Sequence, residues 1–273
     1  MNEITVLITG STDGIGQECA LQHAWSGARV LLHGRNPSRG QAVLEHIRKA
    51  TGNKLVELFL ADFTSLKQVR GLAVEVSARY PRIDVLVNNA GTYMRERQLT
   101  EDGFETTFAV NHLAPYLLTT LLLGTLKAGQ GSRIVNVSSM VHQNAGWDFN
   151  NLQGEKRYDA YAAYSLSKLA NLLFTYELSR RLDGSGVTVN ALHPGVIATK
   201  LLRAGFGSVG GGTVKEGADR IMFLSTSSSV EGVSGKYFVS DVERTSSPDS
   251  RDEKLQKELW TLSEKLTGKE RSS

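Results

Sequence analysis

The 273-residue sequence contains a single cysteine, Cys19, and six scattered histidines, with no Cys or His pair at the spacing of metal ligands. One cysteine excludes an intramolecular disulfide and suits a reducing compartment, so we expect a cytoplasmic protein. Cys19 itself falls in a segment of helical period, where a small packed residue is the simplest interpretation. No metal site is predicted.

Long apolar runs and clusters of one charge are also scarce. The longest uncharged window, 106–126, contains Asn111, His112, Pro115 and several threonines, so it is too polar to cross a membrane at low cost. We interpret this window as a buried or interface helix. A first strand from Ile4 leaves no room for a signal peptide, and we expect no stable membrane anchor in this chain. The net charge is only +3, and no basic run with interleaved aromatics indicates a nucleic-acid partner.

No segment has the composition of a linker between domains. The glycine-rich stretches at 205–212 and 232–235 are short, and regular segments flank both. With 40% hydrophobic residues, the chain is long enough for one large core. We therefore predict a single domain over residues 1–273. It includes a substrate loop at about 195–212, which is either a mobile lid or a disordered surface loop, and a C-terminal helix at about 250–267.

Short apolar runs alternate with longer stretches of helical period. Several runs are apolar nearly throughout, which is typical of strands that helices cover on both faces. This alternation predicts an α/β fold, a doubly wound sheet of about seven parallel strands with right-handed crossovers. The predicted strands are Ile4–Thr9, Arg29–His33, Leu55–Leu60, Val85–Asn88, Arg133–Ser138, Val187–His193 and Lys236–Ser240. The predicted helices are Gly16–Trp25, Pro37–Ala50, Ser65–Arg79, Thr106–Leu126, Tyr158–Leu182 and Val214–Leu224.

The first predicted strand runs directly into a glycine-rich turn, and a helix follows. Glycines let the chain turn tightly and bring backbone amides close to a pyrophosphate at the helix N-terminus. Glycines also fill ordinary turns, so the motif gains its weight from the strand before it and the helix after it. We predict a dinucleotide site whose first residues are Gly10, Ser11, Asp13, Gly14, Ile15 and Gly16.

The end of the second predicted strand bears on which dinucleotide is bound. An NAD site usually carries an acid there, which accepts hydrogen bonds from the ribose 2′-hydroxyl and would repel the 2′-phosphate of NADP. This strand ends His33-Gly34-Arg35-Asn36, without an acid. Arg35 is either a phosphate and adenine contact or a surface arginine at a helix entrance. We favour NADP (NADPH) over NAD and include Asn36 in the site.

The ends of the third and fourth strands add further candidates. Asp62 can accept from the adenine amino group or cap the following helix, and Phe63 follows it. After the fourth strand, the small residues of Asn88-Asn89-Ala90-Gly91 allow a close approach of backbone to ligand. We therefore add Asn89, Ala90 and Gly91 to the predicted site.

Tyr164 and Lys168 lie four positions apart, on one face of the helix predicted at 158–182. A phenol has a pKa near 10, and a neighbouring ammonium favours the phenolate and lowers that pKa. Tyr176 and Arg180 share the spacing, but they lie about 18 Å further along the helix, away from the strand ends. We predict that Tyr164 transfers a proton and that Lys168 tunes Tyr164 and binds ribose.

Ser138 and Ser139 end the fifth predicted strand, at the sheet edge where ligands bind in this architecture. Adjacent serines also form simple strand-end turns. Only one of the two can point into the cleft, because side chains alternate along a strand.

Together these segments resemble the short-chain dehydrogenase/reductase family over nearly the whole chain. The motifs follow in the family's order: TGSTDGIG at Thr9–Gly16, NNAG at Asn88–Gly91, VNH at Val110–His112, VSS at Val137–Ser139, YSLSK at Tyr164–Lys168 and HPG at His193–Gly195. The resemblance implies a Rossmann-type fold and a nicotinamide cofactor. It further implies that Ser139 orients the substrate and that Asn111 holds a water in a proton relay. By the same likeness, Pro194, Gly195, Val196 and Thr199 contact the cofactor, with Thr199 at the nicotinamide amide.

Within that family, the segments 151–182 and 234–238 resemble the retinol-dehydrogenase-like branch, which acts on retinoids and other apolar carbonyls. Ser139 and Tyr164 are separated by a longer segment than in most of the family. We predict that the extra residues, Met140 to Asp159, form part of the substrate wall; a surface excursion is the alternative. His142 within it either touches substrate or packs the loop.

We thus predict an NADP(H)-dependent oxidoreductase that transfers a hydride between nicotinamide and an apolar aldehyde, ketone or retinoid-like small molecule. The alternative is a catalytically silent sensor or scaffold of the same fold. Such proteins usually lack a member of the serine, tyrosine and lysine set, which is complete here. A hydrolase would need Gly-x-Ser-x-Gly, which does not occur. The sequence leaves the oligomeric state open; a homodimer or a homotetramer would pair the helices at 106–126 and 158–182, as many relatives do.

Overall fold

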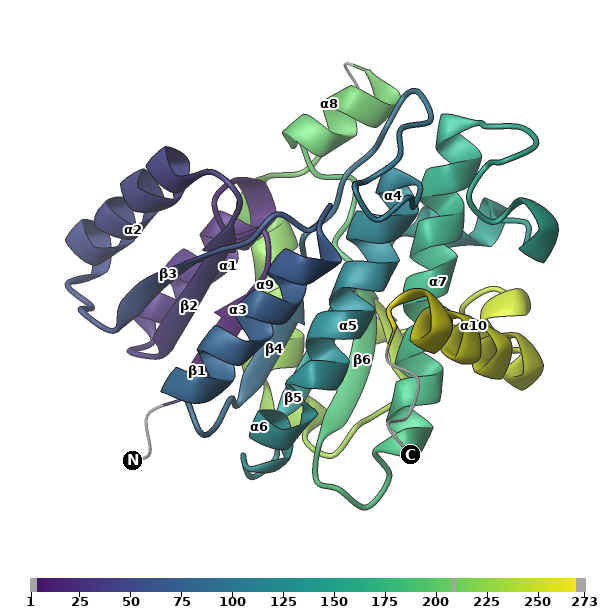
Figure 1. Cartoon of the computed structure of the whole chain (residues 1–273). Helices are drawn as coiled ribbons and strands as arrows, with labels where there is room; N and C mark the ends of the chain where they lie inside the picture. Colours follow the sequence, from purple (N-terminus) through teal and green to yellow (C-terminus); the bar gives the residue numbers. More distant parts are fainter. Residues whose placement is uncertain (1–3, 208–209, 269–273) are drawn as a thin grey trace.

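An eight-stranded sheet forms the centre of the computed structural model, which describes residues 4–207 and 210–268 (Figure 1). The strand order is β3-β2-β1-β4-β5-β6-β7-β8, and all neighbouring pairs are parallel except β7 and β8. The strands are β1 Thr5–Ile8, β2 Arg29–Gly34, β3 Val56–Leu60, β4 Val85–Asn88, β5 Arg133–Val137, β6 Thr188–His193, β7 Lys236–Val239 and β8 Val242–Glu243. The predicted α/β doubly wound fold is therefore confirmed.

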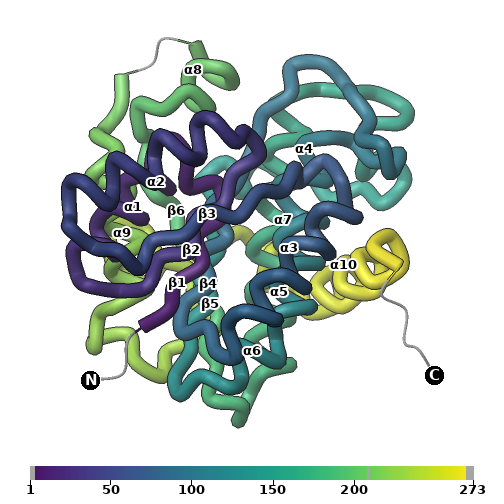
Figure 2. The backbone as a smooth tube through the Cα atoms, turned by 60° about the vertical axis from the view of Figure 1, so that its left-hand side comes forward, coloured from purple at the N-terminus to yellow at the C-terminus, as the bar shows by residue number. Residues whose placement is uncertain are grey.

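Helices cover both faces of this sheet (Figure 2). Each face has its own apolar cluster, because successive side chains of a strand point to opposite faces: Leu7 of β1 belongs to one cluster, and Val6 and Ile8 to the other. The face of Leu7 is covered by α3 Leu66–Arg79, α5 Ala114–Leu121 and α7 Ala160–Arg181. The opposite face is covered by α1 Gly14–Trp25, α2 Pro37–Thr51 and α9 Val214–Thr226.

The short antiparallel strand β8 is absent from the sequence prediction of about seven parallel strands. It pairs with β7 through a two-residue loop, Ser240-Asp241, whose φ angles are 49° and 63°. Two consecutive residues with positive φ match the twist that a tight hairpin requires. A strand of two residues has too little alternation to be recognised in a sequence.

The helix predicted over 106–126 is present but interrupted. The segment is divided into α4 Thr106–Phe108, a π-helical turn over Ala109–Leu113, α5, and α6 Leu123–Lys127. The π-helical turn lies just before Pro115, because proline has no N–H to donate to the carbonyl four residues earlier, at Asn111.

The C-terminal helix is α10, Glu253–Leu266, close to its predicted bounds. Its Trp260 ring lies 5.1 Å from the Tyr116 ring of α5 and 6.1 Å from the Phe174 ring of α7. The buried hydroxyl of Ser263 lies 2.7 Å from Nε2 of His112. Helix α10 therefore occupies part of the helical face that the sequence suggests for pairing between subunits (Figure 1).

Within the described part of the chain, no helix combines the length and the apolar character that a membrane span requires.

Candidate active site

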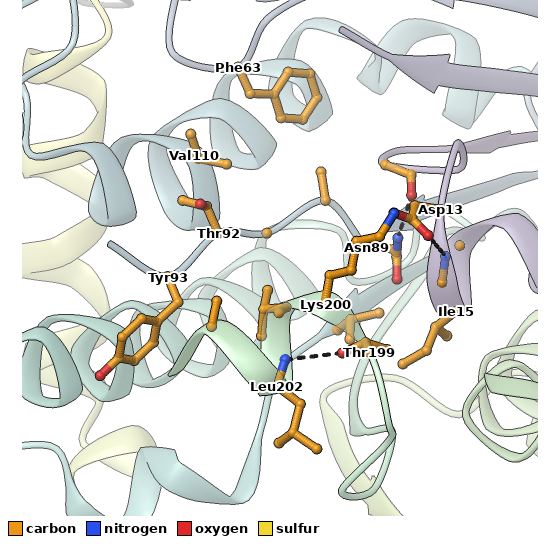
Figure 3. Close-up of a pocket in the computed structure, with 18 of the residues that line it drawn as sticks. Asp13, Ile15, Phe63, Asn89, Thr92, Tyr93, Val110, Thr199, Lys200 and Leu202 are labelled. Atoms are coloured by element: carbon orange, nitrogen blue, oxygen red, sulfur yellow. Dashed lines mark hydrogen bonds and ion pairs between the residues drawn. The ribbon is translucent and has the colours of Figure 1, made fainter. Parts of the chain in front are cut away.

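A cavity of about 1490 Å³ opens at the carboxyl ends of the parallel strands (Figure 3). It lies where β1 neighbours β4, the point at which the strand order reverses and where ligands bind in doubly wound sheets. Nearly all the site residues predicted from the sequence line it: Gly10, Asp13, Gly14, Ile15, Gly16, Arg35, Asn36, Asp62, Phe63, Asn89, Ala90, Gly91, Ser139, Tyr164, Lys168, Pro194, Gly195, Val196 and Thr199. The two exceptions are Ser11 and Asn111.

The glycine-rich turn is packed so tightly that it accepts no side chains at two positions. Gly10 has a φ of +64°, and a Cβ there would stand 2.8 Å from the Cα of Ala90. A Cβ at Gly16 would collide with the Gly10 carbonyl and with Asn89. The Asn89 amide in turn donates to the carbonyl oxygens of Thr9 (2.9 Å) and Gly10 (3.2 Å). At these two positions the turn therefore presents backbone and no side chain to the cavity, at the N-terminus of α1.

His33, at the end of β2, anchors this turn and was not among the predicted site residues. The Gly10 N–H donates to His33 Nδ1 at 3.1 Å, so Nε2 carries the proton and donates to the Ala61 carbonyl at 3.1 Å. Burial lowers the pKa of His33 to about 4 and keeps the ring neutral. The only sequence signal for this role is a polar residue at the end of an otherwise apolar strand.

Ser11 supports the turn from behind instead of lining the cavity. Its hydroxyl accepts a hydrogen bond of 2.8 Å from the His33 N–H, and its own N–H donates to the His33 carbonyl at 2.9 Å. The side chain is fully buried. Its predicted place at the cofactor is therefore corrected to a place beneath the turn.

Two arginines and two acids lie around the part of the cavity next to β2 and α2. Arg35 lies 3.7 Å from Asp62, and Arg39 of α2 lies 3.9 Å from Asp13. Asp62 accepts from the N–H of Thr64 and does not cap α3. Arg39, in the first turn of α2, was not among the predicted site residues.

The capping alternative for Asp62 is wrong, because the N-cap of α3 is Ser65, which accepts from the Gln68 N–H. Caps of this kind do occur at two other site residues. Asp13 accepts from the Gly14 N–H at the start of α1, and Asn36 accepts from the Arg39 N–H at the start of α2.

Tyr164 and Lys168 lie buried side by side on α7. Lys168 Nζ is 5.5 Å from the centre of the Tyr164 ring and donates to the Val137 carbonyl at 3.0 Å. Of the two adjacent serines, Ser138 already has a hydrogen-bond partner within the protein, since its hydroxyl donates to the Lys168 carbonyl at 2.8 Å. Ser139 accepts from the Val141 N–H at 3.4 Å, which leaves its own hydroxyl proton available to a ligand.

The electrostatics of this pair differ from the prediction. Burial raises the pKa of the Tyr164 hydroxyl above its usual value, and burial lowers the pKa of the Lys168 ammonium to about 8. In the protein alone, desolvation therefore outweighs the attraction that an ammonium exerts on a phenolate. Tyr164 is a neutral phenol at neutral pH, suited to donate a proton.

Asn111 lies in the π-helical turn, behind the cavity wall. Its side-chain oxygen accepts from the Thr92 N–H at 2.8 Å, and its amide donates to the Thr92 carbonyl (3.0 Å) and to Ser167 (2.9 Å). The side chain is thus fully engaged in holding the chain after Gly91 against α7. The relay water that the resemblance assigns to Asn111 stays a prediction.

The predicted substrate loop contains a helix, α8 Lys200–Phe206, and Thr199 is its N-cap. Residues 208 and 209 of this loop lie outside the described residues. Two contacts hold α8 across the cavity. At its start, Lys200 Nζ lies 2.5 Å from Asp13 of the glycine turn (Figure 3). At its end, Arg95 Nε donates to the Ala204 carbonyl at 3.0 Å.

An aromatic cluster closes the cavity beside Tyr164. The ring of Tyr93 lies 5.5 Å from the Tyr164 ring and 5.8 Å from the Phe206 ring. A Cβ on Gly205 would stand 3.0 Å from the Tyr93 ring, so α8 packs closely against it. Tyr93 and Phe206 were not among the predicted site residues, because no motif or spacing in the sequence places them beside Tyr164.

The segment from Met140 to Asp159 contributes less to the substrate wall than predicted. Of these residues, all of which the structure describes, Met140 and Val141 line the cavity. Trp147 packs against the core, and Phe149 lies edge-on to it at 5.1 Å. His142 is fully buried and packs the loop, which decides between its two proposed roles.

A glycine turn at the switch point of a doubly wound sheet, with a buried tyrosine and lysine on the same cavity, is the arrangement of a dinucleotide-dependent oxidoreductase. The family model described as short chain dehydrogenase matches residues 4–206. Human retinol dehydrogenase 13 is 41% identical to the chain over 284 residues, which cover 98% of this chain and 86% of the relative.

Two solved structures extend this likeness. An uncharacterised protein from Mycobacterium paratuberculosis is 33% identical with a TM-score of 0.82, and the match covers 97% of this chain and 93% of the other. A short chain dehydrogenase from Shigella flexneri complexed with NADP is 25% identical with a TM-score of 0.73, over 89% and 98% of the two chains. The chain belongs to the short-chain dehydrogenase/reductase family, in its retinol-dehydrogenase-like branch, and is an oxidoreductase.

Proposed function

We propose that this protein is an NADP(H)-dependent reductase and dehydrogenase of apolar carbonyls and alcohols, with Tyr164 as the proton donor and acceptor. The observation that carries the proposal is the shared cavity. The glycine turn, the hydroxyl of Ser139 and the buried pair of Tyr164 and Lys168 all line it. A dinucleotide on the turn therefore reaches the same space as the group that moves the proton.

The residues at the turn fit a dinucleotide. The crowding around Gly10 and Gly16 leaves backbone instead of side chain facing the cavity, and α1 directs its N-terminus there. This is the arrangement that holds a pyrophosphate. Thr199 and Val196 also line the cavity, and Thr199 lies beside the turn, since a Cβ on Gly14 would stand 3.5 Å from its methyl group.

NADP is favoured over NAD by the charges around the adenosine end. No acid ends β2, and Arg35 and Arg39 both line the cavity there. Arg35 lies 3.7 Å from Asp62 and Arg39 lies 3.9 Å from Asp13, which is beyond hydrogen-bond distance. A 2′-phosphate between the two arginines would therefore gain two cationic partners. The NADP bound to the Shigella flexneri relative supports this choice. Comparison of kcat/KM with NADPH and NADH tests it, and a preference for NADH would contradict it.

The chemistry divides among three side chains. The nicotinamide, when bound, supplies or accepts the hydride. The Ser139 hydroxyl donates to the carbonyl oxygen and stabilises the charge that develops there. Tyr164, kept neutral by burial, donates its proton to that oxygen in the reductive direction. Lys168, with its pKa lowered to about 8, lies beside the phenol ring and favours the phenolate that remains.

The walls around Tyr164 favour an apolar substrate. Tyr93 and Phe206 place two aromatic rings within 6.3 Å of the Tyr164 ring. Met140, Leu201 and other apolar side chains continue this lining. The retinol dehydrogenases among the relatives make retinoid-like aldehydes suitable first substrates.

Replacement of Tyr164 by Phe tests the mechanism. We expect the loss of most turnover, about a hundredfold to ten-thousandfold, because the proton donor is removed. Binding of NADPH, followed by its fluorescence, should remain. Tyr176→Phe is the matched control, since this tyrosine of the same helix binds Ser246 away from the cavity and its variant should keep its turnover. Full activity of Tyr164→Phe would refute the mechanism.

A further inference from the structure

His142 connects Ser139, the serine proposed to bind the substrate oxygen, to the C-terminal part of the chain. Its Nδ1 lies 2.7 Å from the carbonyl oxygen of Ser139. Its Nε2 lies 3.2 Å from the backbone nitrogen of Ser247, more than a hundred positions later. The ring stands edge-on to the Tyr237 ring of β7 at 5.1 Å, and the side chain is fully buried.

The protonation of this histidine follows from its partners. The Ser247 N–H can only donate, so Nε2 must be the acceptor. Nδ1 therefore carries the proton and donates to Ser139. Burial lowers the pKa of His142, in agreement with a neutral ring. Both ring nitrogens are thus committed to backbone groups, and neither is available for proton transfer to a substrate.

The segment that His142 holds begins where the sheet ends. Ser138 still bonds to β6, since its N–H donates to the Leu192 carbonyl at 2.8 Å. Ser139 is the next residue and is the N-cap of the 3₁₀ turn Met140–Asn144. Within this turn, the Ser139 carbonyl accepts from the His142 N–H at 3.2 Å and from the His142 ring at 2.7 Å. The hydrogen bond from the His142 ring is the shorter of the two, and the other nitrogen of this ring accepts from the Ser247 N–H.

We propose that His142 is a positioning residue, which fixes the backbone of Ser139 so that its hydroxyl meets the substrate oxygen. This inference rests on the proposed function, in which Ser139 donates to that oxygen. Its consequence is that Ser247, which does not line the cavity, acts on catalysis through His142. An effect on catalysis is expected because a misplacement of about 1 Å in a reacting group can cost about a hundredfold in rate.

Four variants test the proposal: His142→Phe, His142→Asn, Ser139→Ala and the double variant Ser139→Ala/His142→Phe. Phenylalanine keeps the ring against Tyr237 and removes both hydrogen bonds. We expect kcat to fall about tenfold to a hundredfold, with the dissociation constant of NADPH within about twofold of wild type. Asparagine can still donate to the Ser139 carbonyl, so His142→Asn should recover part of kcat.

The double variant separates positioning from general stability. If His142 acts through the Ser139 hydroxyl, His142→Phe should cause no further loss of kcat once that hydroxyl is absent. An equal loss in both backgrounds would overturn the proposal, as would an unchanged kcat in His142→Phe. His23→Phe is the matched control, a buried histidine outside the cavity that should keep its kcat.

Two further outcomes are distinguishable. If His142→Phe does not fold, a fifth variant, Ser139→Ala/His142→Asn, carries the test: a kcat equal to that of Ser139→Ala, together with a reduced kcat in His142→Asn alone, supports the proposal. Failure of the proposed function itself would appear in Tyr164→Phe, as retained turnover. An inactive Tyr164→Phe with a fully active His142→Phe would overturn only the inference about His142.

Discussion

Acidification should loosen the glycine turn through His33, and the size of the effect can be worked out from the structure. His33 is neutral because Nδ1 accepts from the Gly10 N–H. A proton on Nδ1 would make this nitrogen a donor that faces the Gly10 N–H, so the hydrogen bond between His33 and the turn would be lost. Burial lowers the pKa of His33 to about 4, against an ordinary value of 6.5.

The sign of the effect follows from linkage. Between pH 6.5 and 4 the unfolded chain binds a proton at this site and the folded chain does not, so stability is lost as the pH falls through this window. At pH 5 the difference is about 1.5 pH units, which corresponds to about 2 kcal/mol of unfolding free energy from His33 alone. Above pH 6.5 the contribution is fully present.

Urea unfolding of wild type and His33→Gln at pH 7 and pH 5 measures this contribution. The variant has no group that titrates there, so its loss of unfolding free energy between the two pH values should be smaller by about 2 kcal/mol. Binding of NADPH should weaken on acidification in wild type and less in the variant. Parallel pH dependences of the two proteins would refute the reasoning.

Three other changes have definite expected results. Gly10→Ala should weaken NADPH binding at least tenfold by fluorescence titration, because its Cβ would stand 2.8 Å from the Ala90 Cα; unchanged affinity would contradict this packing. Lys200→Gln should raise the NADPH dissociation rate a few-fold in stopped flow, since an exposed ion pair such as that with Asp13 is worth about 1 kcal/mol or less. High salt should reproduce that rise in wild type and not in the variant. Trp260→Ala should lower the unfolding free energy by about 3–5 kcal/mol in urea. The kcat of the folded variant should stay unchanged, and a loss of turnover would show that α10 affects the site.

Much of the sheet can be predicted from the sequence, for a physical reason. Strands such as β1 and β4 are buried on both faces, so they are apolar nearly throughout, and the helices between them repeat at another period. The glycine turn is recognisable because Gly10 and Gly16 occupy positions where a Cβ does not fit. These are local constraints, and a sequence records local constraints directly.

The features missed from the sequence depend on contacts between distant segments. Lys200 and Asp13 are 187 positions apart, and neither has a neighbour that indicates the other. Phe206 reaches Tyr93 only because α8 folds back over the cavity. The raised pKa of Tyr164 results from burial, which the four-residue spacing to Lys168 does not report. Such effects require the tertiary arrangement.

The position of α10 has a consequence for how the enzyme should behave on dilution. Trp260 and Ser263 fill, from within the same chain, a helical face beside α5 and α7. In an enzyme whose helical face is covered by a second chain, dilution separates the chains and uncovers that face. Here the covering helix is covalently attached, so its local concentration is fixed. We therefore expect the specific activity to be the same in a dilute assay as in a concentrated stock.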